Sequence, residues 1–263
     1  MTIEMEISMP RKPRVIEPGN IYHLISRFVA GEWFIRSPQQ RRWYLRLLGN
    51  ALLGSDWRCF SYAIMSNHIH LGVVAGFSSL ASWIRDVHGE FAEDINEQRG
   101  RIGSVFVRGP KSRAVRPDGV ATLIGYIHQN PVRAGVVEHP VDSDWTSHPV
   151  YMGRAERPLW LDMELGLALT DFRDGEALDH WMAATPLVRE QMQQALVEPR
   201  SAGRPRIVPR QLQPAVRQSD WTEDCTERVA SQGNTSGCTV PAAQSNTSED
   251  RTVPAVQRDA LAA

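Results

Sequence analysis

Residues 57–74 read WRCFSYAIMSNHIHLGVV, two apolar runs separated by the dipeptide Ser66-Asn67. Both runs are rich in the aromatic and β-branched residues that favour strands, and a two-residue connection of this kind is typical of a hairpin. The second run opens with His68-Ile69-His70. Because side chains alternate between the two faces of a strand, both imidazoles are expected on the same face. The stretch therefore predicts an antiparallel hairpin that carries a pair of histidines.

A strand and a helix are expected before this hairpin. The turn signal Pro18-Gly19-Asn20 leads into residues 22–29 (YHLISRFV), which have strand composition. Ser37-Pro38 then supplies an N-cap followed by proline at the first helical position. We expect that helix to reach residue 53, where Gly54 ends it.

The elements after the hairpin complete the pattern. Residues 78–98 have apolar side chains near a 3.6-residue period, as in an amphipathic helix. Residues 105–115 are a fourth strand candidate, interrupted by Gly109-Pro110, and residues 119–129 are a third helix. The order strand, helix, strand, strand, helix, strand predicts an α+β protein. Its fold would be the ferredoxin-like split βαβ arrangement, an antiparallel sheet with helices packed on one face.

The sequence divides into four parts. Residues 1–9 are expected to be a flexible N-terminus, and residues 10–152 carry all the elements described above. Residues 153–199 form a small helical accessory region, with short helices expected at 161–172 and 185–196. Residues 200–263 are rich in Pro, Ser, Thr, Gln, Gly and Arg, which predicts a disordered low-complexity tail.

Composition excludes several classes of protein. No run of 18 apolar residues is present, so no transmembrane helix is predicted, and the cytoplasm is the expected compartment. Three scattered cysteines are too few for a disulfide framework or a cysteine-based zinc site. The net charge is −1, but residues 10–150 carry 17 Lys and Arg against 12 Asp and Glu. That basic part is where a polyanion would bind, although ordinary scatter of surface charge explains so small an excess equally well.

Two groups of residues are candidates for chemistry. His68 and His70 would form half of a divalent-metal site, the alternative being two histidines on a solvated strand face. Tyr126 is followed at helical spacing by Gln129 and Asn130, one of whose amides would lie beside it. A tyrosine is able to act as a covalent nucleophile, and an amide oxygen is a hard ligand for Mg²⁺ or Mn²⁺. Pro131 disfavours a helical Asn130, so the shared-face argument is firmer for Gln129.

Together these motifs resemble a known family. Residues 62–71 (YAIMSNHIHL) resemble the "MPNHxH" strand of the single-tyrosine HUH transposases, in particular the REP-associated tyrosine transposases and their insertion-sequence relatives. Residues 126–136 (YIHQNPVRAGV) are similar to that family's "YIHxNPVRAGLV" segment. Tyr22-His23 and residues 145–151 (WTSHPVY) agree as well, so that the resemblance spans roughly residues 10–152.

The resemblance implies a reaction and a set of roles. His68 and His70 would be metal ligands and Tyr126 the nucleophile, with Asn130 as a further ligand and Gln129 as a metal-binding or supporting residue. The implied metal is Mg²⁺ or Mn²⁺. Tyr126 would attack a phosphate of single-stranded, hairpin-associated DNA, giving a 5′-phosphotyrosine link that another 3′-OH later reverses. The family often supplies the tyrosine helix to a partner subunit, so a homodimer is implied.

A basic segment and two competing functions complete the analysis. We expect six side chains around the fourth strand to follow the DNA backbone, the alternative being a solvated charged edge: Arg99, Arg101, Arg108, Lys111, Arg113 and Arg116. The first competing function is a catalytically silent, domesticated protein that binds DNA or RNA hairpins. The second is a metal-dependent hydrolase of small phosphoesters, which the lack of carboxylates near His68 disfavours.

Overall fold

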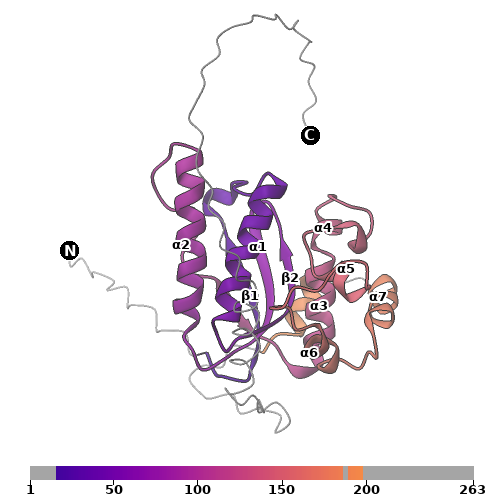
Figure 1. The fold of residues 1–263 in the computed structure, drawn as a ribbon. Helices are drawn as coiled ribbons and strands as arrows, with labels where there is room; N and C mark the ends of the chain where they lie inside the picture. The colour runs from indigo at the N-terminus through magenta and orange to yellow at the C-terminus, as the bar shows by residue number, and fades with distance from the viewer. Residues whose placement is uncertain (1–15, 186–188, 198–263) are drawn as a thin grey trace, which may run out of the picture. The chain divides into compact units, whose positions relative to one another are not determined.

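The computed structural model describes residues 16–185 and 189–197, so the expectations for residues 1–9 and 200–263 lie outside the described residues. Four strands form one antiparallel sheet in the order β2-β3-β1-β4, as Figure 1 shows in part. Their bounds are β1 Ile21–Arg27, β2 Arg58–Ile64, β3 His68–Val74 and β4 Lys111–Ala114. The predicted α+β class and split βαβ order are confirmed.

Two long helices cover one face of this sheet (Figure 1). Helix α1 spans Pro38–Leu53, and its N-terminus is a complete capping box in which Ser37 and Gln40 each bond the other's backbone N–H. Helix α2 spans Leu80–Gln98 and is capped by Ser79. Both helices contact each other and bury apolar side chains against the sheet. The cap predicted from the sequence at Ser37 places the start of α1 correctly.

Further helices cover the other face, which corrects the expectation that helices pack on one face only. Helix α3 (Val120–His128) packs on β2 and β3 from the side opposite α1 and α2 (Figure 1). Strands β1, β2 and β3 are accordingly buried along nearly their whole length, whereas the edge strand β4 is exposed or partly exposed. A strand covered on both faces reads as a continuous apolar run, and HIHLGVV has that character apart from its two histidines.

The fourth strand is shorter than predicted. Only Lys111–Ala114 pair with β1, whereas residue Phe106 makes an isolated bridge to Phe28. Between them Arg108 has a φ of 57°, a left-handed conformation that few residues other than glycine adopt. The ladder is interrupted there because Pro110 also lacks a backbone N–H to donate.

The helices after residue 150 belong to the second layer. Helix α6 (Met163–Ala168) lies within a predicted helix, α7 (Gly175–Ala184) was not predicted, and α8 (Arg189–Gln194) falls inside residues 185–196. Their buried side chains Leu165, Leu178 and Met192 share one hydrophobic cluster with α3. The region predicted as accessory therefore contributes to the core over α3.

The remaining elements are short connections. They are the 3-10 helices η1 (Val29–Gly31), η2 (Pro117–Gly119) and η3 (Pro140–Asp142), and the single turns α4 (Asn130–Arg133) and α5 (His148–Tyr151). Within the described part of the chain, no helix has the length and apolar character needed to cross a membrane.

Candidate active site

The two histidines of β3 stand on the face of the sheet that α3 covers. Ile69, between them, points to the opposite layer and belongs to the core under α1 and α2. The imidazole centroids of His68 and His70 lie 4.8 Å apart, with the rings nearly perpendicular. The alternation of a strand thus places both rings side by side, as the sequence predicts.

A hydrogen bond fixes each ring through its Nδ1 atom. The Nδ1 of His70 lies 2.7 Å from Nε2 of His23, which reaches across from β1. The Nδ1 of His68 lies 2.6 Å from Oδ1 of Asn67. Because a metal-bound histidine is usually held by a hydrogen bond at its other ring nitrogen, this pattern leaves the second nitrogen of each ring, Nε2, turned toward the other residues of the site.

Burial keeps these histidines uncharged near neutral pH. Desolvation, followed by the charges of Arg113 and Arg133, lowers the pKa of His23 to about 3. Desolvation, then the charge of Arg27, lowers the pKa of His68 to about 4, and burial holds the pKa of His70 well below its usual value. Neutral imidazole is the form that binds metal ions.

Helix α3 brings Tyr126 to the same place. The Tyr126 ring centroid lies 5.9 Å from that of His70 and 5.9 Å from that of His23, in edge-on arrangements. Its side chain is partly exposed. The tyrosine and the histidines that lie together here are all residues of the same chain.

Asn130 joins this group, and Gln129 does not. The Asn130 side chain hydrogen-bonds His68, and its Nδ2 donates to the Tyr126 carbonyl at 2.9 Å. Helix α3 ends at His128, and α4 begins at Asn130 with Pro131 following, so the chain turns as the proline predicts. Gln129 instead donates to the Met182 carbonyl on α7 at 3.0 Å. The amide that lies beside the histidines is therefore that of Asn130, although helical spacing favoured Gln129.

Two further residues lie at the candidate site but were not predicted from the sequence as site residues. One is His23, for which Tyr22-His23 was only a point of family agreement. The other is Arg133, whose guanidinium carbon lies 3.9 Å from the centre of the Tyr126 ring. Its side chain also donates to Asn130 Oδ1 at 3.4 Å. Arg133 lies on α4, beyond the turn that ends α3, so helical spacing from Tyr126 does not predict this contact.

The six predicted DNA-binding side chains separate into groups. Lys111 and Arg113 stand opposite Ile25 and His23 in the β1–β4 ladder, so they project on the face that carries the histidines. Arg99 and Arg101 lie over the Phe34 ring at 4.7 Å each. The two others lie at the ends of β4: Arg108 is exposed, and Arg116 pairs with Asp118 at 3.0 Å. Only the pair on β4 adjoins the candidate site.

The donor set fits a hard divalent cation held by few protein ligands. Among residues 16–185 and 189–197, no three or more His, Cys, Asp or Glu side chains are grouped so as to hold a metal. The candidate ligands are two neutral imidazoles and one amide oxygen, from His68, His70 and Asn130. Magnesium commonly keeps several waters and takes few protein ligands, and manganese accepts both imidazole and oxygen ligands.

Comparisons with known proteins found similar solved structures but no similar family model or curated protein. No protein-family model matches the chain, and no curated protein matches it. A solved structure described as a REP-associated tyrosine transposase bound to a REP hairpin is similar to it, with a TM-score of 0.47 and 16% sequence identity. The match covers 64% of this chain and 97% of that chain.

Proposed function

We propose that this protein cleaves and rejoins single-stranded DNA near a hairpin, with Tyr126 as the covalent nucleophile. The observation that carries the proposal is the position of the Tyr126 ring, 5.9 Å from that of His70. His68 and Asn130 complete the group. A nucleophile beside two neutral imidazoles and an amide is an arrangement suited to phosphoryl transfer with a divalent cation.

The reaction follows from what these groups are able to do. A divalent cation held by His68, His70 and Asn130 would supply Lewis-acid polarisation of the scissile phosphate. The Tyr126 oxygen attacks phosphorus and loses its proton, while the bond from phosphorus to the 3′-oxygen breaks and that oxygen takes up a proton. The products are a 5′-phosphotyrosine and a free 3′-OH. A second 3′-OH reverses the step and rejoins DNA without another source of energy.

Charged residues around the tyrosine support this reading. The Arg133 guanidinium, stacked on the Tyr126 ring, would stabilise the negative charge that develops on the phosphate. Lys111 and Arg113 lie on the same face of the sheet and would hold the flanking phosphates. His23 would act on His70 by orienting it.

The test is detection of a covalent protein–DNA adduct on a denaturing gel. Purified protein is mixed with hairpin oligonucleotides that carry single-stranded flanks, taken from the DNA around its own gene, with Mn²⁺ or with EDTA. We expect an adduct that needs the metal and disappears in Tyr126→Phe. Tyr44→Phe is the matched control, because Tyr44 is buried in the opposite layer of the fold. An adduct that persists in Tyr126→Phe would contradict the assignment.

The same experiment separates the competing function. A protein that binds the hairpin tightly, yet forms no adduct with any flank or metal, would be a catalytically silent binding protein. Hydrolysis of a small phosphodiester without any covalent intermediate would instead indicate a simple phosphoesterase.

A further inference from the structure

An exposed tryptophan lies beyond the end of the sheet at which His68 stands. Trp33 is 61% exposed and belongs to the segment 28–37, which connects β1 to α1. Ile35 in this segment donates its backbone N–H to the carbonyl of Ser66 at 3.2 Å, two residues before His68. The segment therefore runs beside the turn that leads into the candidate active site.

The backbone at Trp33 is held in place although its side chain is exposed. The Trp33 carbonyl accepts hydrogen bonds from Nε of Arg36 and from a terminal nitrogen of Arg99, both at 2.9 Å. The next ring, Phe34, is fully buried under the guanidinium groups of Arg99 and Arg101. An exposed ring on a fixed backbone loses little conformational freedom when a flat ligand stacks on it. Trp33 is therefore prepared for a stacking contact.

Positive charge gathers around this tryptophan. Residues 27–36 and 99–108 together carry five arginines and one acidic residue. The backbone N–H of Val107 donates to the Arg27 carbonyl at 2.8 Å, so the two segments lie side by side. We call them the Trp33 corner. Such an excess of one charge on a small surface suits a polyanion.

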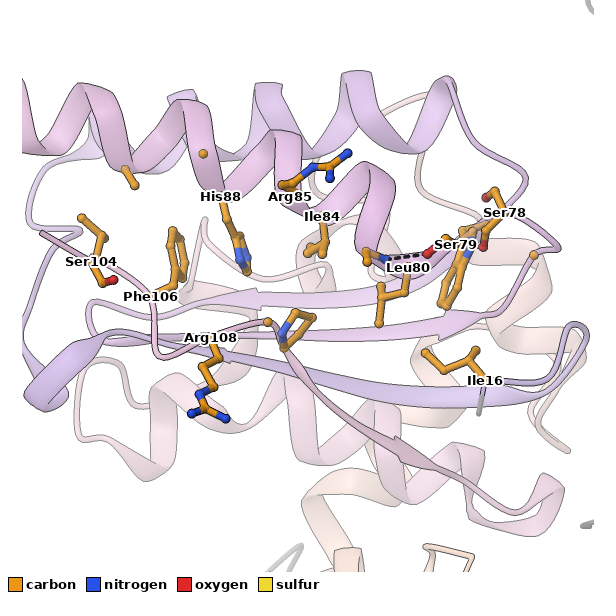
Figure 2. A pocket seen from close by; sticks show the side chains of 18 of the residues that line it. Ile16, Ser78, Ser79, Leu80, Ile84, Arg85, His88, Ser104, Phe106 and Arg108 are labelled. Carbon is orange, nitrogen blue, oxygen red and sulfur yellow. Dashed lines mark hydrogen bonds between the residues drawn. The ribbon is translucent and has the colours of Figure 1, made fainter. Parts of the chain in front are cut away.

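The Trp33 corner is continuous with the candidate active site. Arg27 stands opposite His68 in the β1–β3 ladder, so both side chains project on the same face of the sheet. Farther along, Arg108 is exposed, and Figure 2 shows its side chain directed away from α2, whereas Phe106 is directed toward that helix. A strand bound at the histidines would therefore pass Arg27 and reach the corner.

The backbone of the corner is strained as well. Within the described part of the chain, the non-glycine residues with a left-handed φ are Ala30, at 53°, and Arg108, at 57°. Both belong to the Trp33 corner. Residues in such conformations cost free energy and are frequent where a protein holds a ligand. The strain agrees with a binding role for this surface.

The occupant needs both a flat apolar part and negative charge. Ile102 and Val107 are exposed in the corner in addition to Trp33, and the arginines lie among these three side chains. Single-stranded DNA offers both features, because its bases are free to stack on aromatic rings and its phosphates are charged. An apolar protein surface would leave the arginines without opposite charge, and duplex DNA keeps its bases stacked on one another.

We propose that Trp33 stacks on one unpaired base of the DNA strand bound at the candidate active site, and that the arginines of the corner hold the neighbouring phosphates. The inference rests on the proposed function, because it requires the protein to bind single-stranded DNA. Every base has a π-face, so this contact fixes the path of the strand and not its sequence.

The test is equilibrium binding of a hairpin oligonucleotide with an unpaired flank, taken from the DNA around the gene, in the presence of Mn²⁺. All proteins carry Tyr126→Phe, so that binding is measured without a covalent adduct. Adding Trp33→Ala should weaken binding by about tenfold, the order expected for one stacked base, and Trp33→Phe should restore most of it. Phe77→Ala is the matched control, because Phe77 is 82% exposed and follows the other end of β3.

An abasic site placed at each position of the flank in turn identifies the stacked base. At one position, loss of the base should weaken binding by about tenfold in the protein that keeps Trp33 and in Phe77→Ala. The same loss should have no effect in Trp33→Ala. The proposal is overturned if Trp33→Ala binds as tightly as the protein that keeps Trp33, or if both show the same abasic penalties.

Two other outcomes are distinguished by the same variants. If Trp33→Ala bound DNA normally but dissociated an oligomer in analytical ultracentrifugation, the corner would contact a second copy of this chain and the proposal would be overturned. A Tyr126-dependent adduct together with Trp33-independent binding overturns this inference alone. Trp33-dependent binding without any adduct in the wild type overturns the proposed cleavage alone, and a protein that binds no oligonucleotide overturns both.

Discussion

At the scale of single residues, the chemistry of Tyr126 depends on what surrounds its ring. A phenol is a weak nucleophile, so the proposed reaction depends on groups that stabilise the charge developing on the phosphate. Arg133 stands over the ring at 3.9 Å and reaches Asn130 as well. A planar guanidinium is also suited to phosphate, which it binds with two parallel hydrogen bonds. In the proposed reaction, Arg133 would therefore hold the phosphate beside the Tyr126 ring.

The first prediction concerns Arg133→Gln. Adduct formation should slow by about 100-fold, the usual cost of removing one group that stabilises transition-state charge. Arg133→Lys should recover part of the rate, since it keeps the charge and loses the planar fork. The measurement is the single-turnover rate of adduct formation with saturating oligonucleotide. Arg173→Gln, an exposed arginine that pairs with Asp174, is the control, and an equal effect in both variants would exclude a specific role.

The site residues that could be predicted from the sequence are those that lie in a regular local pattern. His68 and His70 follow from the alternation of a strand, and the eleven-residue segment around Tyr126 carries its own signature. His23 is different, because its contact with His70 depends on the β1–β3 register, in which His23 stands opposite Gly72. A register across 47 residues of sequence separation is set by packing over the whole sheet, which no local pattern records.

At the scale of elements, local signals decided which parts of the fold were predictable. Helix α1 has proline at its first position, a capping serine and a terminal glycine, and its predicted bounds are confirmed. Helix α7 was missed, although Asp174 caps it by accepting a hydrogen bond from Ala177 N at 2.8 Å. Its ten residues are stabilised chiefly by tertiary packing of Leu178 and Met182 against α3, which is invisible in a short window.

The second prediction compares Gly89, which lies inside α2, with Gly175, the first residue of α7. Gly89 in α2 faces open space, so Gly89→Ala should raise the free energy of unfolding by about 1 kcal/mol through helix propensity. At Gly175, the first residue of α7, a Cβ would overlap the backbone carbonyl of Tyr151. Gly175→Ala should therefore lower the free energy of unfolding by about 1–3 kcal/mol. Urea unfolding measures both.

Opposite signs for the two variants would support the packing of α7 on the main fold. If Gly175→Ala left the free energy of unfolding unchanged, the region from residue 153 onward would pack only weakly on the main fold, as expected for an accessory region.

At the scale of the whole molecule, the residues of the candidate active site come from elements far apart in one chain. Tyr126 comes from α3, and the histidines come from β1 and β3, so the helix that carries the proposed nucleophile packs on the sheet of the same chain. The homodimer implied by family resemblance stays a prediction. Within the single chain, Tyr126 lies beside the histidines of its own sheet, which motivates the prediction that follows.

The third prediction is that two inactive variants do not restore each other. A mixture of Tyr126→Phe with a His68→Ala, His70→Ala double variant, refolded together, should form no adduct. If the tyrosine were supplied to a partner subunit in a two-fold dimer, mixed dimers would restore about a quarter of the activity. Adduct yield on a denaturing gel distinguishes these results, and a mixture of wild type with either variant is the positive control.

The fourth prediction concerns acid stability, because several buried histidines are neutral in the folded state. Burial lowers the pKa of His88 to about 3, whereas its ordinary value is 6.5. Below about pH 6.5 the His88 ring binds a proton in the unfolded chain but not in the folded protein. His88 therefore contributes stability that is present above pH 6.5 and is lost as the pH falls toward 3. The loss is at most about 1.4 kcal/mol per pH unit.

His88→Leu tests this directly, since leucine has a similar volume and no proton to bind. The free energy of unfolding should fall less steeply between pH 6.5 and pH 4 than in the wild type, by up to about 1.4 kcal/mol per pH unit. At pH 7 the variant should be at least as stable, because the unpaired Nε2 is removed from the interior. Replacement of an exposed histidine, His139→Gln, is the matched control. If the free energy of unfolding of His88→Leu fell with pH as steeply as that of the wild type, His88 would take up its proton in the folded protein as well.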